Sequence, residues 1–365
     1  MSDSNHSKTP VHPAITSLLA SLKLGEPQIH KGIGLWPVFA GIRLEPAYIT
    51  LVEALAMDGF KIMEVSQGGS VPDLRVVNET PHHVLLFDGE ELKGAKQNRI
   101  LNTTILIAAG SALDVPVSCT ESGRWTYQSA EFSSSGSLAY AGLRKLKAST
   151  VASSLQTGTS HASDQGAVWD EIEHLHMAAM SDNSSKTRAM KDAYDGRQRE
   201  LDEFSRDVPC HDAQCGMLAV VGDRVEGIDV LSRPDAYARL HRRLVESHAM
   251  DFLVRKRGVA RKPLDPEAPA RFIAEAAKAE ESVHGTPGLG SDHRLRFRWG
   301  HGAALLVGDT AFGDHVSKLA VGGGDNTDHR LAGFVLPNTR KLACVEKSQQ
   351  LHLHFGGEIC YLVEE

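Results

Sequence analysis

The chain lacks paired cysteines, long apolar runs and an excess of basic residues, which mark disulfide-rich, membrane and nucleic-acid-binding proteins. Its five cysteines form no CxxC pair and are odd in number, so a disulfide framework is not expected. No apolar run is long enough to span a bilayer, and the polar first residues lack the apolar core of a signal peptide. The net charge of −7 argues against bulk electrostatic binding of nucleic acid. These absences predict a cytoplasmic protein without a membrane partner.

Motifs of well-known enzyme classes are also missing. The sequence contains no Walker motif, no GxSxG, no kinase signature and no HExxH. Residues 285–290 read GxxGxG, but they follow a predicted helix and do not connect a strand to a helix, so the context for dinucleotide binding is wrong. The sequence therefore assigns no cofactor, and it leaves the oligomeric state open.

What the chain does contain is a series of strand-like and helix-like segments. Residues 113–119 alternate apolar and polar side chains, as in a strand with one buried face, and residues 100–107 are expected to pair with them antiparallel. Residues 216–221 and 225–231 flank Gly222 and predict a β-hairpin. Helices are expected at residues 235–257 and 269–283.

Together these segments predict an α+β fold, an antiparallel β-rich sandwich or open barrel with an inserted helical middle section. The expected organisation is a disordered tail (1–12), a β-rich N-terminal region (13–132), a Ser- and Gly-rich loop or lid (133–163), an α+β region of the same or a second domain (164–310) and a β-rich C-terminal extension (311–365).

The densest run of chemistry-capable side chains lies at residues 88–99, a predicted loop beside two strands. Its candidate ligand-binding residues are Lys96, Gln97, Asn98 and Arg99, because guanidinium and ammonium groups hold phosphate or carboxylate. Glu90 and Glu91 are candidate general bases. The alternative is a solvated hairpin loop held by salt bridges.

A second polar group follows the strand at residues 113–119. Glu121 is a further candidate base, and Arg124 with Trp125 could stack a planar ligand; a simple Glu121–Arg124 ion pair is the alternative. Cys119 continues the apolar face of the strand, so a packed thiol is favoured over a nucleophile. If the two strands pair, Asn98 and Arg99 should lie near Glu121 and Arg124.

Histidines give a weaker indication of metal binding. His352 and His354 share one face of a predicted strand, at a spacing that can hold zinc. No third ligand is evident, so no metal site is predicted and packed or solvated histidines are favoured.

The segment at residues 84–125, VLLFDGEELKGAKQNRILNTTILIAAGSALDVPVSCTESGRW, resembles the hallmark block of a bacterial and archaeal domain family. Trp169-Asp-Glu171, Gln214-Cys-Gly216 and Ser247-His-Ala-Met-Asp251 resemble its later blocks, and the resemblance covers residues 32–310. The family is named for its association with ADP-ribosylglycohydrolases and rhodanese-phosphatase proteins. The resemblance implies a link to ADP-ribose or NAD-derived metabolism, and it carries over no catalytic residues.

Three functions are consistent with these observations. The first is a module that binds a nucleotide-like or ADP-ribose-like small molecule through the two polar groups. The second is a hydrolase of an ADP-ribose or phospho-sugar linkage, with Glu90, Glu91 or Glu121 as base. The third is a non-catalytic scaffold or interaction protein. The lack of a recognisable catalytic arrangement favours the binding and scaffold functions, taken together, over catalysis.

Overall fold

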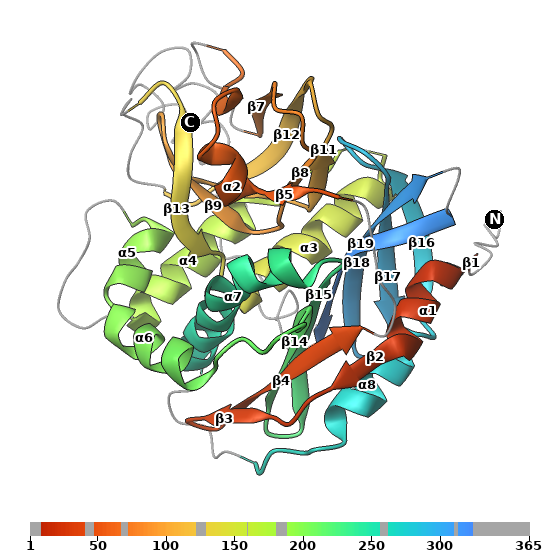
Figure 1. The fold of residues 1–365 in the computed structure, drawn as a ribbon. Coiled ribbons are helices and arrows are strands. Elements are labelled where there is room, and N and C mark those ends of the chain that lie inside the picture. The colour runs from red at the N-terminus through yellow and green to blue at the C-terminus, as the bar shows by residue number, and fades with distance from the viewer. Residues whose placement is uncertain are drawn as a thin grey trace, which may run out of the picture.

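The computed structural model describes residues 9–40, 47–66, 72–121, 129–158, 160–179, 188–255, 262–309 and 313–323. Within these ranges helices combine with largely antiparallel sheets, which confirms the predicted α+β class (Figure 1). No helix in these ranges combines the length and apolarity needed to cross a membrane.

The largest sheet brings together strands from both ends of the described chain. In spatial order it contains β1 (Thr9–Pro10), β16 (Glu280–Gly285), β17 (Ser291–Phe297), β18 (Gly300–Asp309), β19 (Gly313–Gly323), β15 (Arg224–Leu231), β14 (Gly216–Val221), β4 (Ile33–Ala40) and β2 (Leu22–Leu24), and β3 (Gln28–His30) also pairs with β4. The predicted hairpin is β14–β15, with Gly222 at φ 61° in its turn, a conformation that favours glycine.

Two smaller sheets form a separate β-rich unit. One contains β13 (Phe132–Leu138), β9 (Glu90–Gly94), β10 (Arg99–Leu101), β12 (Ser111–Cys119), β7 (Asp73–Asn78) and β6 (Phe60–Glu64), and the other contains β11 (Ile105–Ile107), β8 (Val84–Leu86) and β5 (Ile49–Thr50). Their shared core includes Leu74, Val76, Leu86 and Leu101, all fully buried.

Helices cover both faces of the largest sheet. They are α1 (Pro13–Ser21), α3 (Ala141–Gln156), α4 (Gln165–Ala179), α5 (Met190–Asp195), α6 (Gln198–Asp207), α7 (Pro234–Arg255) and α8 (Ala268–Ala276). The short helix α2 (Leu51–Leu55) packs instead in the core of the two smaller sheets. Helices α1 and α8 pack on one face, whereas α3 to α7 share a core with the other face and with the smaller sheets (Figure 1). The space between α3 and this second face holds the site described below.

Several predicted boundaries were wrong. The expected loop at residues 133–163 contains β13 and α3. Helix α3 escapes an apolar-periodicity search because its buried face includes Arg144 and Lys147. Thr9 and Pro10, placed in the disordered tail, pair with β16.

Two predicted elements are divided in the structure. The expected strand at residues 100–107 is β10 and β11, which lie in different sheets on either side of a buried polar turn. The expected helix at residues 269–283 ends at Ala276, and its last residues belong to β16. In both cases pairing with neighbouring strands overrides the local pattern.

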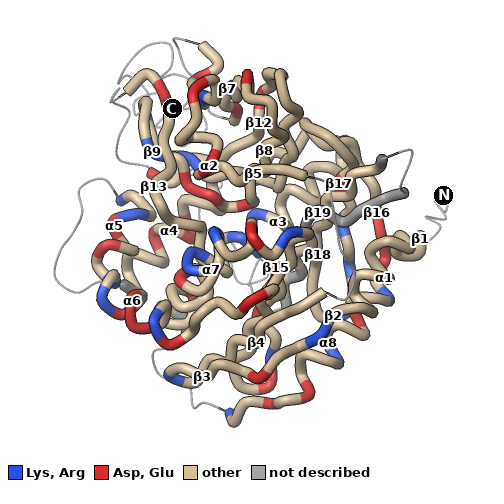
Figure 2. The backbone as a smooth tube through the Cα atoms, viewed as in Figure 1, with Lys and Arg blue, Asp and Glu red and all other residues tan. Residues whose placement is uncertain are grey.

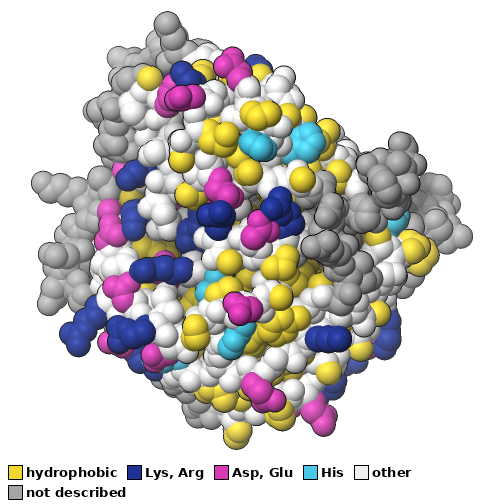
Figure 3. Space-filling view, in the orientation of Figure 1, with side chains coloured by type: hydrophobic (Ala, Val, Ile, Leu, Met, Phe, Trp, Pro, Cys, Tyr) yellow, Lys and Arg dark blue, Asp and Glu magenta, His cyan; other side chains and the backbone are white. Residues whose placement is uncertain are grey.

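Acidic and basic residues alternate along the backbone trace in the view of Figure 2. The surface in Figure 3 shows the same mixture, with apolar side chains between charged groups of both signs. This face therefore carries no extended patch of one charge.

Candidate functional site

The structure brings the two predicted polar groups together at one end of the β9–β10 hairpin. Arg99 lies opposite Cys119 in the register of β10 and β12. The Gln97 side chain donates to the main-chain oxygen of Glu121 (2.7 Å), and the main-chain N–H of Asn98 donates to the Glu121 carboxylate (3.4 Å). The predicted proximity to Glu121 is confirmed, whereas Arg124, Trp125, His352 and His354 lie outside the described residues.

These side chains point into the protein interior. Arg99 is fully buried and donates to Gln97 (3.0 Å), and the Lys96 side chain beside them is half-buried. Glu90 is 1% exposed, bonds Arg243 at 2.7 Å and accepts from the amide of Phe87 at 2.8 Å. Glu90 and Glu91 lie in strand β9 rather than in the predicted loop. The solvated-loop alternative was therefore wrong as well.

Cys119 is also internal. Burial, the largest cause, raises the pKa of its thiol to about 11, while nearby Arg99 opposes the rise. Such a thiol stays protonated at neutral pH and is a poor nucleophile. The structure thus supports the packed-thiol alternative.

Glu91 should make stability depend on pH. Burial raises the pKa of Glu91 to about 7 from an ordinary 4.5, despite a hydrogen bond from Thr120 (2.9 Å). Between these pH values the folded protein binds more protons than the unfolded chain, so the free energy of unfolding should fall as pH rises, by about 3 kcal/mol in all. Glu91→Gln should remove this fall, as measured by urea unfolding at pH 5 and pH 8.

The matched control is the exposed Glu79→Gln, which should keep the wild-type difference between the two pH values. An equal pH dependence in wild type and Glu91→Gln would show that the Glu91 carboxyl does not titrate as its burial implies.

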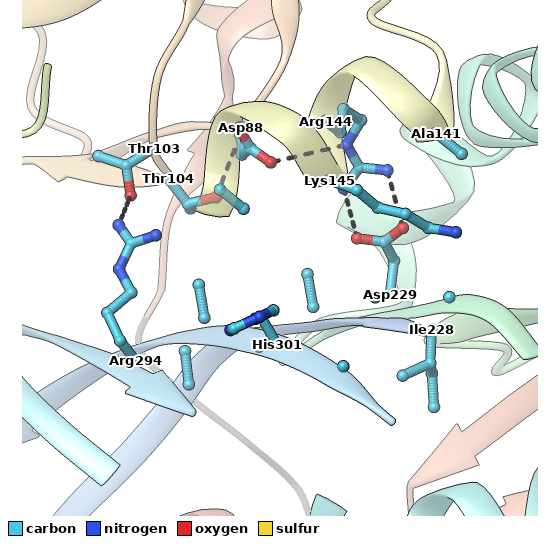
Figure 4. Close-up of a pocket in the computed structure, with 18 of the residues that line it drawn as sticks. Asp88, Thr103, Thr104, Ala141, Arg144, Lys145, Ile228, Asp229, Arg294 and His301 are labelled. Atoms are coloured by element: carbon cyan, nitrogen blue, oxygen red, sulfur yellow. Dashed lines mark hydrogen bonds and ion pairs between the residues drawn. The ribbon is translucent and has the colours of Figure 1, made fainter. Parts of the chain in front are cut away.

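A different set of residues surrounds a cavity between the largest sheet and α3. The cavity holds about 900 Å³ of unfilled space, counted out to the solvent at its mouth. Its floor is formed by β15, β18 and β19, which contribute mainly glycines and alanines together with Ile228, His301 and Leu305. Charged side chains surround this floor (Figure 4). Among the described residues of the segment at 84–125, only Asp88 and the turn at residues 102–104 line the cavity.

The floor has a defined pattern across four strands. Arg294, Ala303, Ala320 and Asp229 lie directly opposite one another in the registers of β17, β18, β19 and β15. Residues paired in this way share one face of the sheet. Neighbouring strands lie about 4.8 Å apart, so the two charged ends stand about 14 Å apart over two methyl groups.

One end of the row is closed by a clamp from α3. Arg144 donates to both carboxylate oxygens of Asp229, at 2.9 and 2.6 Å, and its Nε lies 3.6 Å from Asp88. Although burial opposes it, the two carboxylates raise the pKa of Arg144. Lys147, fully buried one turn along α3, bonds Asp88 and the main-chain oxygen of Leu101. Burial lowers the pKa of Lys147, and Asp88 opposes that fall.

The other end of the row is a second buried ion pair. Arg294 bonds Asp292 and donates to the hydroxyl of Thr103 (3.0 Å), and His161 lies 2.9 Å from the same Asp292 oxygen. Burial raises the pKa of Asp292, but Arg294 and His161 outweigh it and the net shift is downward. Asp292 therefore stays ionised at neutral pH and holds Arg294 in place.

Several donors in the cavity wall lack hydrogen-bond acceptors. Among the described residues, neither ring nitrogen of His248 has a hydrogen-bond partner, although the residue is only 3% exposed and lies 3.9 Å from Asp229. Nε of Arg144 and Nε of Arg294 also lack one. Buried polar groups are usually satisfied, so unsatisfied donors beside a cavity are positions where a ligand could accept. No cluster of metal-ligating side chains occurs among the residues that the structure describes.

Some of the residues that line the cavity or support its wall stand out in the sequence. Arg144, Lys145 and Lys147 form a basic run, and His248 lies in one of the blocks that resemble the family. Asp229 and Arg294 carried no signal, because each lies in an ordinary strand pattern.

Comparison with known proteins identifies the chain at the level of a family. The sequence model of the ARG and Rhodanese-Phosphatase-superfamily-associated Protein domain matches residues 21–318. The chain belongs to this family. The match includes the residues that line the cavity except Ala320 and Gly322, and it confirms the resemblance seen in the sequence. No curated protein and no solved structure gives a significant match.

Proposed function

We propose that the cavity above β15, β18 and β19 binds a nucleotide-like or ADP-ribose-like small molecule. The observation that carries the proposal is the row of Arg294, Ala303, Ala320 and Asp229, with Arg144 clamped over its far end. A span of about 14 Å between charged ends suits an elongated ligand with polar groups at both ends.

The charges of the wall match the chemistry of such a ligand. Guanidinium groups at both ends can donate to phosphate oxygens. The carboxylates of Asp88, Asp229 and Asp292 can accept hydrogen bonds from sugar hydroxyls. The alanine and glycine floor leaves room for a flat ring to lie against the sheet. A wall with both signs of charge favours a ligand that carries hydroxyl donors as well as an anionic group.

A larger side chain in the floor of the cavity should weaken this binding. Ala303 is half-buried, and its methyl group lies in the middle of the row. Ala303→Leu should weaken binding by about 10- to 100-fold, since overpacking a tight site costs about 1–3 kcal/mol. Isothermal calorimetry with ADP-ribose, NAD and AMP as probes measures the change.

The control is Ala112→Leu, an exposed position on β12 outside the cavity, which should bind as wild type does. If wild type binds none of the three probes at millimolar concentration, or if Ala303→Leu binds them unchanged, this proposal is wrong.

A further inference from the structure

Strand β17 carries a second set of polar side chains on the face away from the cavity. Side chains alternate along a strand, so Ser291 and His293 face the opposite side from Asp292 and Arg294. Glu281 of β16 lies opposite Leu295, and therefore on the same face as His293. Leu295 belongs to the core under α1 and α8, which identifies this face as the one those helices cover.

These three side chains form a continuous hydrogen-bonded chain. The hydroxyl of Ser291 lies 2.7 Å from Nε2 of His293, and Nδ1 of His293 lies 2.6 Å from a carboxylate oxygen of Glu281. The side chains of His293 and Glu281 are 4% and 2% exposed, while Ser291 is half-buried. His12 at the start of α1 packs edge-on against the His293 ring, with centroids 5.5 Å apart, and helps to fix it.

This order of groups is that of a nucleophile, a base and a group that orients the base. In such sites a hydroxyl bonds one imidazole nitrogen, and a buried carboxylate bonds the other and sets the tautomer. We propose that Ser291, His293 and Glu281 form a second site, distinct from the cavity, which hydrolyses small carboxylic esters with Ser291 as nucleophile.

The surface beside Ser291 leaves room for such a substrate. Gly285 lies opposite Ser291 in the pairing of β16 and β17, and no described atom lies within 4 Å of the place where a Cβ would stand. Val283, opposite His293 on the same face, is 54% exposed. An ester carbonyl can approach over Gly285 while a short apolar acyl group lies against Val283.

The reaction balances with water as the only co-reactant. Ser291 Oγ attacks the ester carbonyl carbon as its proton moves to His293 Nε2. The bond from carbon to the alcohol oxygen breaks, and the alcohol leaves with that proton. Water then attacks the acyl-serine and gives its proton to His293, which returns it to Ser291 as the acid departs. Glu281 holds the imidazole ring throughout and is a positioning residue.

Labelling with an alkyl fluorophosphonate tests the site directly, because a serine activated in this way displaces fluoride and keeps the phosphonyl group. Intact mass and peptide mapping of the full chain should show one adduct, on Ser291. Ser291→Ala should give none, and His293→Ala should slow labelling by about 100-fold or more. Glu281→Gln should slow labelling as well, and Glu281→Asp should restore part of the rate.

The chain supplies a matched control on the other face of the sheet. Ser282 and His284 of β16 form a similar hydrogen bond of 3.0 Å, and Ser282→Ala should label as wild type does. Thermal unfolding of each variant shows that the fold is retained. An unlabelled wild type, or labelling of Ser291 that survives in folded His293→Ala, would overturn the proposal. Binding of ADP-ribose or nucleotides in the cavity is unaffected by either result.

Discussion

Replacing Glu90 with alanine is expected to lower the free energy of unfolding by about 5 kcal/mol. Glu90 and Arg243 form an ion pair of 2.7 Å whose side chains are 1% and 9% exposed. Removing one partner of such a pair leaves a buried charge uncompensated, which costs about 3–5 kcal/mol. The amide of Phe87 also loses its acceptor, so the upper end of this range is expected. Urea unfolding followed by circular dichroism measures the change.

Two control variants distinguish the loss of the buried Glu90–Arg243 ion pair from the loss of any glutamate side chain. Glu131→Ala removes a half-exposed glutamate, 3.2 Å from Lys61, and should cost less than about 1 kcal/mol. Glu90→Gln keeps an acceptor for the Phe87 amide and should cost less than alanine. If Glu90→Ala is as stable as Glu131→Ala, the ion pair with Arg243 contributes nothing to folding.

The position of Glu90 shows what the sequence could and could not give. The acidic, basic and amide side chains at residues 88–99 were predicted to form a binding or catalytic site, and the structure shows several of them buried and bonded inside the protein. The sequence could not show that Arg243 lies opposite Glu90, since the two are separated by 153 positions in the chain. Without that partner, an internal ion pair and a catalytic carboxylate look the same. The prediction of hydrolysis with these carboxylates stays a prediction.

Local patterns gave the elements whose partners are close in sequence. The hairpin of β14 and β15 was predicted from its turn, and α7 from its periodicity. The contact of Asn98 with Glu121 followed from the pairing of β10 with β12. Each of these features follows from the alternation of side chains along a strand or from the helical repeat, and both patterns can be read directly from the sequence.

The cavity could not be predicted because its residues meet only through the tertiary fold. Arg294 and Thr103 are 191 positions apart, and Arg144 and Asp229 are 85 apart. The segment that contains α3 was predicted as a loop from its Ser and Gly content. Charged residues occupy part of the buried face of α3, where the periodicity rule expects apolar ones, so no helical pattern opposed that prediction. Residues that break a local sequence rule often belong to functional sites. Arg144 and Lys147 break the rule because both are charged and both are buried.

Replacing Arg144 with alanine should lower the free energy of unfolding by about 3 kcal/mol and also abolish ligand binding in the cavity. Asp229 is 3% exposed and loses both hydrogen bonds from the guanidinium group, while Asp88 keeps its bond to Lys147. Breaking a buried pair costs about 3–5 kcal/mol, and the lower end is expected because the cavity opens to solvent and can hydrate Asp229. Urea unfolding and calorimetry with ADP-ribose measure the two effects.

Arg75→Ala is the matched control, because Arg75 pairs with Asp114 in a similar way but both side chains are 40% exposed. It should cost less than about 1 kcal/mol and leave binding intact. The two readouts for Arg144→Ala also separate two roles of the clamp. Lower stability with unchanged ligand binding would mean that Arg144 serves only to neutralise the buried charge of Asp229. Lost binding at a temperature where the variant is fully folded would mean that the ligand needs the guanidinium group in order to bind.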